Sequence, residues 1–236
     1  MDGVEADTVL KVAQEQNMKV EKILTTHHHS DHSSGNISLK KLLSTCQQKV
    51  QVYGFEERIE GLDHFLQDGE RIEVGETTVE VLHLPFHTSG HLGFLGGKEG
   101  ERKALFSGDV LFVASCGRFF EGTAAQAHQA LNVRIGSLPD DTLLFCGHEY
   151  TLSNLHFASF LEPHNKDVKE KLEWAKKRRE EEEPTIPSTL GEEKKYNPFL
   201  RTHLPHLKAS LNLPPQAHPI TVMASLRKAK NEFIVF

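Results

Sequence analysis

Thr26-His27-His28-His29-Ser30-Asp31-His32 follows directly on the apolar stretch at residues 20–24 and combines several imidazoles with one carboxylate. Imidazole is the commonest protein ligand for zinc-like ions, and a carboxylate adds an oxygen donor. His27 and His29 are two residues apart, so both point the same way at the end of a strand. Asp31 and His32 follow where the chain turns into a helix. A histidine-rich surface patch or tag would lack the Asp and would not follow a strand, so the segment predicts a metal site.

The composition of the 236-residue chain, with 25% charged and 38% hydrophobic residues, is typical of a globular protein. No segment approaches the apolar length needed to cross a bilayer, and the first residues do not form a secretory signal. The net charge of −6 argues against generic nucleic-acid binding. Cys46, Cys116 and Cys146 are far apart and odd in number, which indicates free thiols in a reducing compartment. We therefore expect a cytoplasmic monomer that binds neither nucleic acid nor membrane, or a mitochondrial protein if an upstream presequence is missing.

Strand signals dominate the first part of the chain and helix signals dominate the second. Val79 and Val81 alternate with polar neighbours, which marks a half-buried strand over 77–84. The other expected strands are 20–26, 50–53, 71–74, 92–95, 104–107 and 143–146. The expected helices are 7–16, 37–43, 123–138, 152–161, 168–183 and 220–233, the last with Pro219 in its first turn. Because strand signals disappear after His148, we expect a metal-binding domain at 1–150 and a helical domain at 151–236. The acidic run at 180–183 is interpreted as solvated surface.

Three further candidate ligands each follow a predicted strand. These are His87, Asp109 and His148. With the first segment they form two sets, namely His27, His29 and His87 for one ion and Asp31, His32 and His148 for a second, with Asp109 between them. Two divalent ions can lower the pKa of a shared water and polarise a carbonyl oxygen. His28 and His91 lie inside the same motifs, but we expect at most a hydrogen bond to a ligand from either.

These motifs, in this order, resemble the metallo-β-lactamase superfamily and, more narrowly, glyoxalase II, the hydroxyacylglutathione hydrolases. The pattern at 27–32 identifies only the superfamily. The narrower resemblance rests on the segments at 106–109, 116–122, 146–150, 187–190 and 196–199. The resemblance implies an α/β fold, an αββα sandwich followed by a C-terminal helical substrate-binding domain. It also implies two divalent ions, which we expect to be zinc, with iron or a mixed centre as the alternative.

The activity that the resemblance implies is hydrolysis of S-lactoylglutathione to glutathione and D-lactate. A hydroxide that bridges the two metals would attack the thioester carbonyl, and Asp31 would orient this hydroxide while it ligates a metal. The leaving thiol has a pKa near 8.5, so its departure needs little help from a general acid. The expected partner is thus a small-molecule glutathione thioester.

Glutathione carries two carboxylates, so its recognition requires local positive charge. The resemblance assigns this task to Arg118, Arg227 and Lys230, together with Tyr150. Phe120 departs from the family pattern, which has Tyr at this position. The missing hydroxyl removes one hydrogen bond, worth roughly 1 kcal/mol.

Two alternatives stay open beside the hydrolase. A persulfide dioxygenase is similar in the first motifs, but uses a single iron and lacks the helical tail that begins at Thr151. Phe120 and the missing first strand pair suggest a second alternative, a non-catalytic or weakly active regulator that binds metal or glutathione. The family usually has a strand pair before the region matching Val4, and we expect this chain to be a fragment or alternative product lacking those first strands. Its segments around Phe120 and at 187–203 also resemble the probable hydrolase associated with paroxysmal nonkinesigenic dyskinesia.

Overall fold

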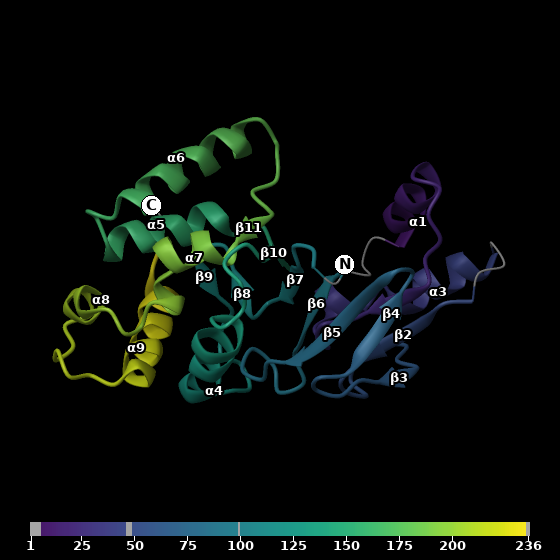
Figure 1. Cartoon of the computed structure of the whole chain (residues 1–236), viewed down its shortest axis with the longest axis horizontal. Helices are drawn as coiled ribbons and strands as arrows, with labels where there is room; N and C mark the ends of the chain where they lie inside the picture. Colours follow the sequence, from purple (N-terminus) through teal and green to yellow (C-terminus); the bar gives the residue numbers. More distant parts are fainter. Residues whose placement is uncertain (1–5, 46–48, 99, 235–236) are drawn as a thin grey trace.

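The computed structural model describes residues 6–45, 49–98 and 100–234, and its longer strands form two sheets (Figure 1). The first sheet contains β1 (Lys22–Leu24), β2 (Gln51–Gly54) and β3 (His64–Phe65), with all pairs parallel. The second sheet has the order β11-β10-β7-β6-β5-β4. Its strands are β4 (Arg71–Val74), β5 (Thr77–His83), β6 (Leu92–Gly97), β7 (Ala104–Gly108), β10 (Leu143–Cys146) and β11 (Ser188–Thr189). Among the described strands of this sheet, β7 and β10 are the only parallel pair. Cys46 lies outside the described residues.

Apolar residues fill the space between the sheets and the space under the flanking helices. Val79 and Val81 of β5 are buried in a cluster with residues of β4 and β6, while Leu82, on the other side of β5, joins the cluster under α4 (Ala124–His128), its π-helical continuation η2 (Gln129–Ile135) and α9 (Pro219–Glu232). The first sheet is covered by α1 (Ala6–Glu15) and α3 (Asn36–Thr45). Each such buried Val or Leu contributes about 1.5–3 kcal/mol. The layers are thus helix, sheet, sheet and helix.

The chain beyond the last candidate ligand is mainly helical and lies at one end of the sandwich (Figure 1). Its remaining helices are α5 (Thr151–Leu161), α6 (Lys166–Glu180), α7 (Leu190–Tyr196), η3 (Pro198–Leu200) and α8 (Pro205–Ser210). Local sequence explains where they begin. Asn165 caps α6, Thr189 and Glu192 form a reciprocal cap on α7, and Pro219 occupies the first turn of α9 as predicted.

The predicted fold class is confirmed, and one expectation about the C-terminal part is wrong. Strands do not disappear after His148, because β11 adds to the edge of the second sheet, with Ser188 opposite Leu144 and Thr189 opposite Leu143. Two residues carry no periodicity, so the edge of β10, and not the local sequence, decides this pairing.

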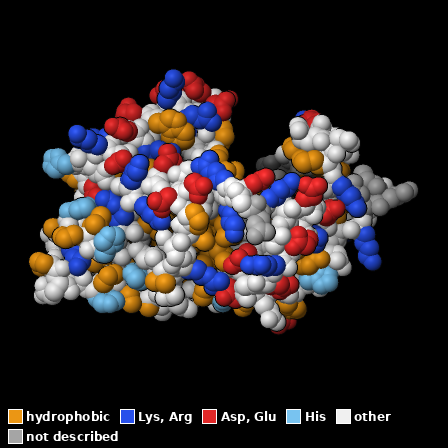
Figure 2. Space-filling view, in the orientation of Figure 1, with side chains coloured by type: hydrophobic (Ala, Val, Ile, Leu, Met, Phe, Trp, Pro, Cys, Tyr) orange, Lys and Arg blue, Asp and Glu red, His pale blue; other side chains and the backbone are white. Residues whose placement is uncertain are grey.

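The charged surface agrees with the sequence analysis. Glu180 to Glu183 are all exposed, as predicted for a solvated run. Figure 2 shows basic and acidic side chains interspersed over the face that carries α6. Within the described residues, no helix is both long and apolar enough to cross a membrane.

Candidate active site

All seven residues predicted to bind metal come together beyond the ends of the strands. The first segment follows β1 and runs into the short helix α2 (Ser30–Ser33), while the later candidates follow β5, β7 and β10. Their donor atoms form overlapping groups, within which all atoms lie within 4.8 Å of one another. The groups are His27, His29 and His87; His27, His32 and Asp109; and Asp31, His32 and His148.

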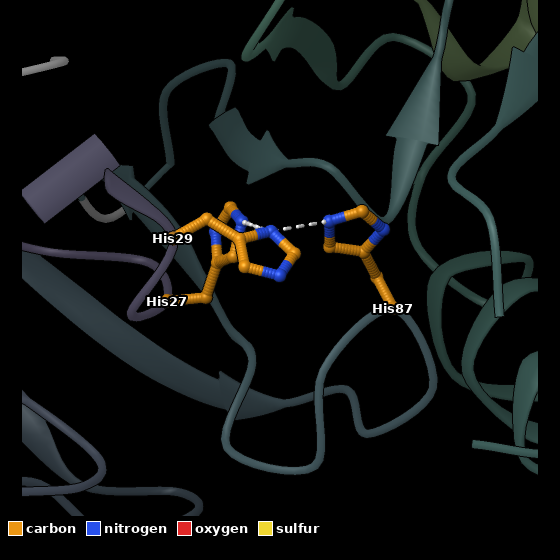
Figure 3. A group of neighbouring side chains, drawn as sticks. All are labelled: His27, His29 and His87. Carbon is orange, nitrogen blue, oxygen red and sulfur yellow. Dashed lines mark hydrogen bonds between the residues drawn. The ribbon is translucent and has the colours of Figure 1, made fainter. Parts of the chain in front are cut away.

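Three imidazole rings form the first cluster, and Figure 3 shows them pointing toward one another. Nδ1 of His29 lies 3.0 Å from Nε2 of His27 and 3.1 Å from Nε2 of His87. Ligand atoms 2.0–2.1 Å from a tetrahedral ion are roughly 3.3 Å apart. The three nitrogens therefore fit the coordination of a single ion.

The second cluster is formed by Asp31, His32 and His148. Nε2 of His148 lies 3.2 Å from Nε2 of His32 and 3.3 Å from Oδ2 of Asp31. Asp109 connects the two clusters, because its Oδ1 is 3.2 Å from Nε2 of His32 and its Oδ2 is 3.5 Å from Nε2 of His87. A carboxylate that reaches both clusters is suited to bridge two ions.

Hydrogen bonds outside the clusters hold the candidate ligands in place. Nδ1 of His87 donates to the carbonyl of Arg118 at 3.0 Å, which leaves Nε2 free to face an ion. His91 is fully buried, and its Nε2 accepts a hydrogen bond from the backbone N–H of Asp109 at 3.1 Å. Its ring also stacks on His27, with centroids 4.6 Å apart. His91 thus holds the backbone of Asp109 in place without belonging to either cluster.

The protonation states of the clusters suit a cation. Burial lowers the pKa of His87 to about 4 and also holds the pKa of His27 far below its usual range. Both rings are therefore neutral at pH 7, as metal coordination requires. Burial alone would raise the pKa of Asp109, but hydrogen bonds from His148 and His32 oppose it, and the net pKa is lowered. Hydrogen bonding to Asp109 raises the pKa of His148, in contrast to His27 and His87. Two neutral imidazoles beside an ionised carboxylate are donors that zinc-like ions accept.

One glycine is required by the close approach of the backbone to these side chains. A Cβ atom at Gly147 would lie 2.5 Å from Oδ1 of Asp109 and 2.8 Å from Cε1 of His32. Any side chain at this position would displace the carboxylate of Asp109 or the ring of His32.

A cavity of about 540 Å³ opens over the two clusters. All five residues predicted to bind substrate line it: Arg118, Phe120, Tyr150, Arg227 and Lys230. The ring of Tyr150 stacks on His148 with centroids 4.9 Å apart. Phe120 is 60% exposed and its ring meets that of His87 edge-on at 5.2 Å. The cavity thus joins the candidate metal centre to residues of the C-terminal helices.

Two cations on α9 make one wall of this cavity basic. Arg227 is only 7% exposed; its Nη1 donates to the carbonyl of Cys116 at 2.9 Å, while its buried Nε has no partner among the described residues. Nζ of Lys230 donates to the carbonyl of Ser153 at 3.1 Å. Burial, with a smaller effect from the charge of Arg227, lowers the pKa of Lys230 to about 8. Cations held in a partly buried wall are suited to bind a carboxylate.

Several residues that line the cavity escaped the sequence analysis. They are Phe112, Ser115, Ser153, Asn154, Asn231 and Phe233. No metal or charge motif marks them. Ser153 and Asn154 lie in the first turn of α5, directly after its N-cap residue Tyr150, and Asn231 follows Lys230 directly. The only signal in the sequence was therefore their nearness to residues that were predicted to bind substrate.

An ion-pair network lies beside the cavity and was also not predicted. Nη1 of Arg58 contacts Oε1 of Glu121 at 2.6 Å, and Nε of Arg58 contacts Oε2 of Glu56 at 2.6 Å. The hydrogen bond from Arg58 lowers the pKa of Glu121. His28 turns away from the candidate ions, with Nδ1 3.1 Å from Oε1 of Glu56. The network ties the loop that carries Phe120 to two neighbouring loops.

Two family models together cover nearly the whole chain. The metallo-beta-lactamase superfamily matches residues 2–148, and the hydroxyacylglutathione hydrolase C-terminus matches residues 149–233. The chain belongs to the hydroxyacylglutathione hydrolase family. A family member from Arabidopsis thaliana, hydroxyacylglutathione hydrolase cytoplasmic, is 41% identical over 99% of this chain and 89% of its own length. The hydroxyacylglutathione hydrolase-like protein of Gallus gallus is also 41% identical, over 99% of this chain and 81% of its own length.

A solved metallo-beta-lactamase from Staphylococcus aureus has the same fold as this family member, with a TM-score of 0.60 at 24% identity. The match covers 94% of this chain and 60% of that one.

Proposed function

We propose that this protein hydrolyses glutathione thioesters, with S-lactoylglutathione and water giving glutathione and D-lactate. The observation that carries the proposal is the cavity in which a basic wall from α9 faces two clusters of metal-binding side chains. A thioester bound by its carboxylates at Arg227 and Lys230 would present its carbonyl to the clusters. Membership in the hydroxyacylglutathione hydrolase family supports the same reaction.

The two clusters are the proposed binding sites of two divalent ions, one held by His27, His29 and His87 and the other by Asp31, His32 and His148, with Asp109 shared. When bound, two such ions lower the pKa of a water and polarise the carbonyl oxygen that is attacked. Zinc is the proposed metal, with iron as the alternative, because most of the donors are imidazoles.

The protein's own side chains position the reacting groups. Asp31, whose Oδ2 is 3.3 Å from Nε2 of His148, orients the attacking water by accepting its hydrogen bond. Arg118, Arg227 and Lys230 bind the carboxylates of glutathione, and the hydroxyl of Tyr150 adds a donor. The product thiol leaves as a thiolate, because its pKa near 8.5 makes it a stable leaving group.

The cytoplasm is the proposed compartment and a monomer the proposed state. The free thiols of Cys116 and Cys146 support a reducing compartment, and the Arabidopsis thaliana relative bears the word cytoplasmic in its name.

Metal analysis combined with a thioester assay tests the proposed function. We expect the purified protein to contain two divalent ions per chain and to release glutathione from S-lactoylglutathione. Oxygen consumption with glutathione persulfide serves as the comparison. Oxygen uptake without thioester cleavage would favour a persulfide dioxygenase, and no turnover by the metal-loaded protein would contradict the hydrolase.

Phe120→Tyr is expected to lower KM for S-lactoylglutathione about fivefold, because a phenol at the cavity surface adds one hydrogen bond worth about 1 kcal/mol. Steady-state kinetics measures this change. Phe65→Tyr is the matched control, since Phe65 is 62% exposed on β3 and lies outside the cavity lining. A lower KM in both variants, or in neither, would contradict a role of position 120 in substrate binding.

The pH dependence of substrate capture should follow the charge of Lys230. Because its pKa is lowered to about 8, Lys230 is charged below this pH and becomes neutral as the pH rises through it. We therefore expect kcat/KM, which reports groups of the free enzyme, to fall above pH 8. In Lys230→Arg the side chain stays charged, so this decline should be lost. An unchanged decline in Lys230→Arg would assign it to another group.

A further inference from the structure

A short hairpin follows Asp109 and forms part of the cavity wall. Its strands are β8 (Leu111–Phe112) and β9 (Ser115–Cys116), which pair antiparallel. Residues of both strands line the cavity, and the chain continues from β9 through one glycine to Arg118. The position of this hairpin therefore sets the position of Arg118 and of the wall beside it.

The turn of the hairpin has an unfavourable backbone conformation, which a buried carboxylate stabilises. Ala114 has a φ of 60°, in the left-handed region that residues other than glycine rarely adopt. Its backbone N–H donates to Oε2 of Glu193 at 2.8 Å. Glu193 is fully buried on α7. Such conformations persist only where the surroundings hold them, and here the C-terminal part of the chain supplies the contact.

Two asparagine side chains bind the main-chain carbonyls of the same hairpin. Nδ2 of Asn197, which is fully buried, donates to the carbonyls of Phe112 at 3.2 Å and Ser115 at 3.1 Å. Nδ2 of Asn154 donates to the carbonyl of Val113 at 3.0 Å. Every residue from Phe112 to Ser115 thus has a main-chain group bonded to a side chain of the C-terminal part.

The second oxygen of Glu193 is held within the C-terminal part itself. Oε1 accepts hydrogen bonds from Oγ of Ser188 at 2.7 Å and from Oη of Tyr196 at 2.8 Å. Oε2 also accepts from Nδ2 of Asn197 at 3.0 Å. Residues of β11 and α7 therefore hold the carboxylate of Glu193 through Oε1, while Oε2 accepts the hydrogen bond from the hairpin. Ser188, Tyr196 and Asn197 belong to the family-like segments at 187–190 and 196–199, and Glu193 lies between these segments. Neither the metal clusters nor the basic wall includes any of these residues.

We propose that Glu193 and Asn197 are positioning residues for substrate binding. They hold the hairpin where the carbonyl of Cys116 accepts the hydrogen bond of Arg227, 2.9 Å away, and where Arg118 lines the cavity. Neither residue lines the cavity itself. The inference rests on the proposed function, because its kinetic test measures KM for a glutathione thioester. The contacts between the hairpin and the C-terminal part can also be tested without a substrate.

The kinetic test compares Glu193→Ala and Asn197→Ala with a control of similar burial. Both variants should raise KM for S-lactoylglutathione roughly tenfold, the effect of losing about one well-placed contact, with little change in kcat per bound metal. Glu162→Ala is the control, because Glu162 is also buried in the C-terminal part but pairs with Arg201 at 2.6 Å and not with the hairpin. It should lower the melting temperature and leave KM unchanged.

A conservative variant separates positioning from stability. In Glu193→Gln the amide oxygen can still accept from Ala114, and the amide NH2 can donate to the hydroxyls of Ser188 and Tyr196, which can turn to accept. KM should therefore stay near the wild-type value. If Glu193→Ala does not fold, Asn197→Ala gives the same measurement, because the bond between Glu193 and Ala114 remains.

Hydrogen–deuterium exchange of the peptide that spans 111–116 tests the same contacts directly. Exchange should be faster in Glu193→Ala than in the wild type, while Glu162→Ala leaves it unchanged. If the wild type hydrolyses no glutathione thioester, the proposed function fails, and the exchange result alone decides the role of Glu193. Wild-type exchange and wild-type KM in folded Glu193→Ala and Asn197→Ala would overturn the inference.

Discussion

Asp109→Asn is expected to lower kcat/KM for S-lactoylglutathione roughly 10³-fold and to reduce the bound metal by about half. The carboxylate oxygens of Asp109 lie 3.2 Å from Nε2 of His32 and 3.5 Å from Nε2 of both His87 and His148. An amide keeps the shape but removes the negative charge between the two proposed ions. Metal content by elemental analysis and initial rates measured on the same preparation check the result.

Asp140→Asn provides the matched control for this substitution. Asp140 is exposed, pairs with Lys194 at 2.6 Å, and belongs neither to the clusters nor to the cavity lining. This variant should bind metal and hydrolyse the thioester as the wild type does. Full metal content and full activity in Asp109→Asn would contradict the bridging role.

Arg227→Gln is expected to raise KM for glutathione thioesters by about 10- to 100-fold, since a hydrogen bond to a charged group is worth about 1.5–3 kcal/mol. Arg227 is buried and lines the cavity, its Nε has no partner among the described residues, and its Nη1 donates to the carbonyl of Cys116. Its guanidinium is thus already ordered before a carboxylate binds, so little entropy is lost on binding. Steady-state kinetics and glutathione inhibition constants measure the effect.

Lys228→Gln removes the same charge from the next residue of the same helix. Lys228 is exposed and does not line the cavity, so KM should stay within about twofold of the wild type, as for surface changes in general. An equal rise in KM for both variants would indicate a general electrostatic effect and not a contact with the substrate.

The sequence predicted those elements of the fold whose positions depend on neighbouring residues in the chain. The strands at 71–74 and 143–146 were predicted residue for residue, because short apolar or alternating runs end at turn residues. The clustering of the candidate ligands was also predictable, because each follows a strand of one sandwich. The helix expected at 123–138 was found at 124–135, and it ends in a π-helical turn that no spacing of apolar residues indicates.

The contacts that position the cavity wall could not be predicted from local sequence. Glu193 stands in Gly191-Glu192-Glu193-Lys194-Lys195, a run that is typical of a solvated helix, yet its side chain is fully buried. Three of its donors are near it in the chain, namely Ser188, Tyr196 and Asn197, but the fourth, Ala114, is 79 residues away. The two-residue strands β8, β9 and β11 could not be predicted for the same reason. Pairing with neighbouring segments determines where they form, and two residues are too few to show a periodic pattern.

The edge strand β11 has a consequence for the order in which the molecule can form during synthesis. The second sheet takes its outermost strand from Ser188 and Thr189, which leave the ribosome only after the whole of α5 and α6. Until then β10 keeps an open edge, which is a template for pairing with other chains. A nascent chain halted after its last metal-binding candidate would therefore be prone to aggregate, although every proposed ligand had already been translated.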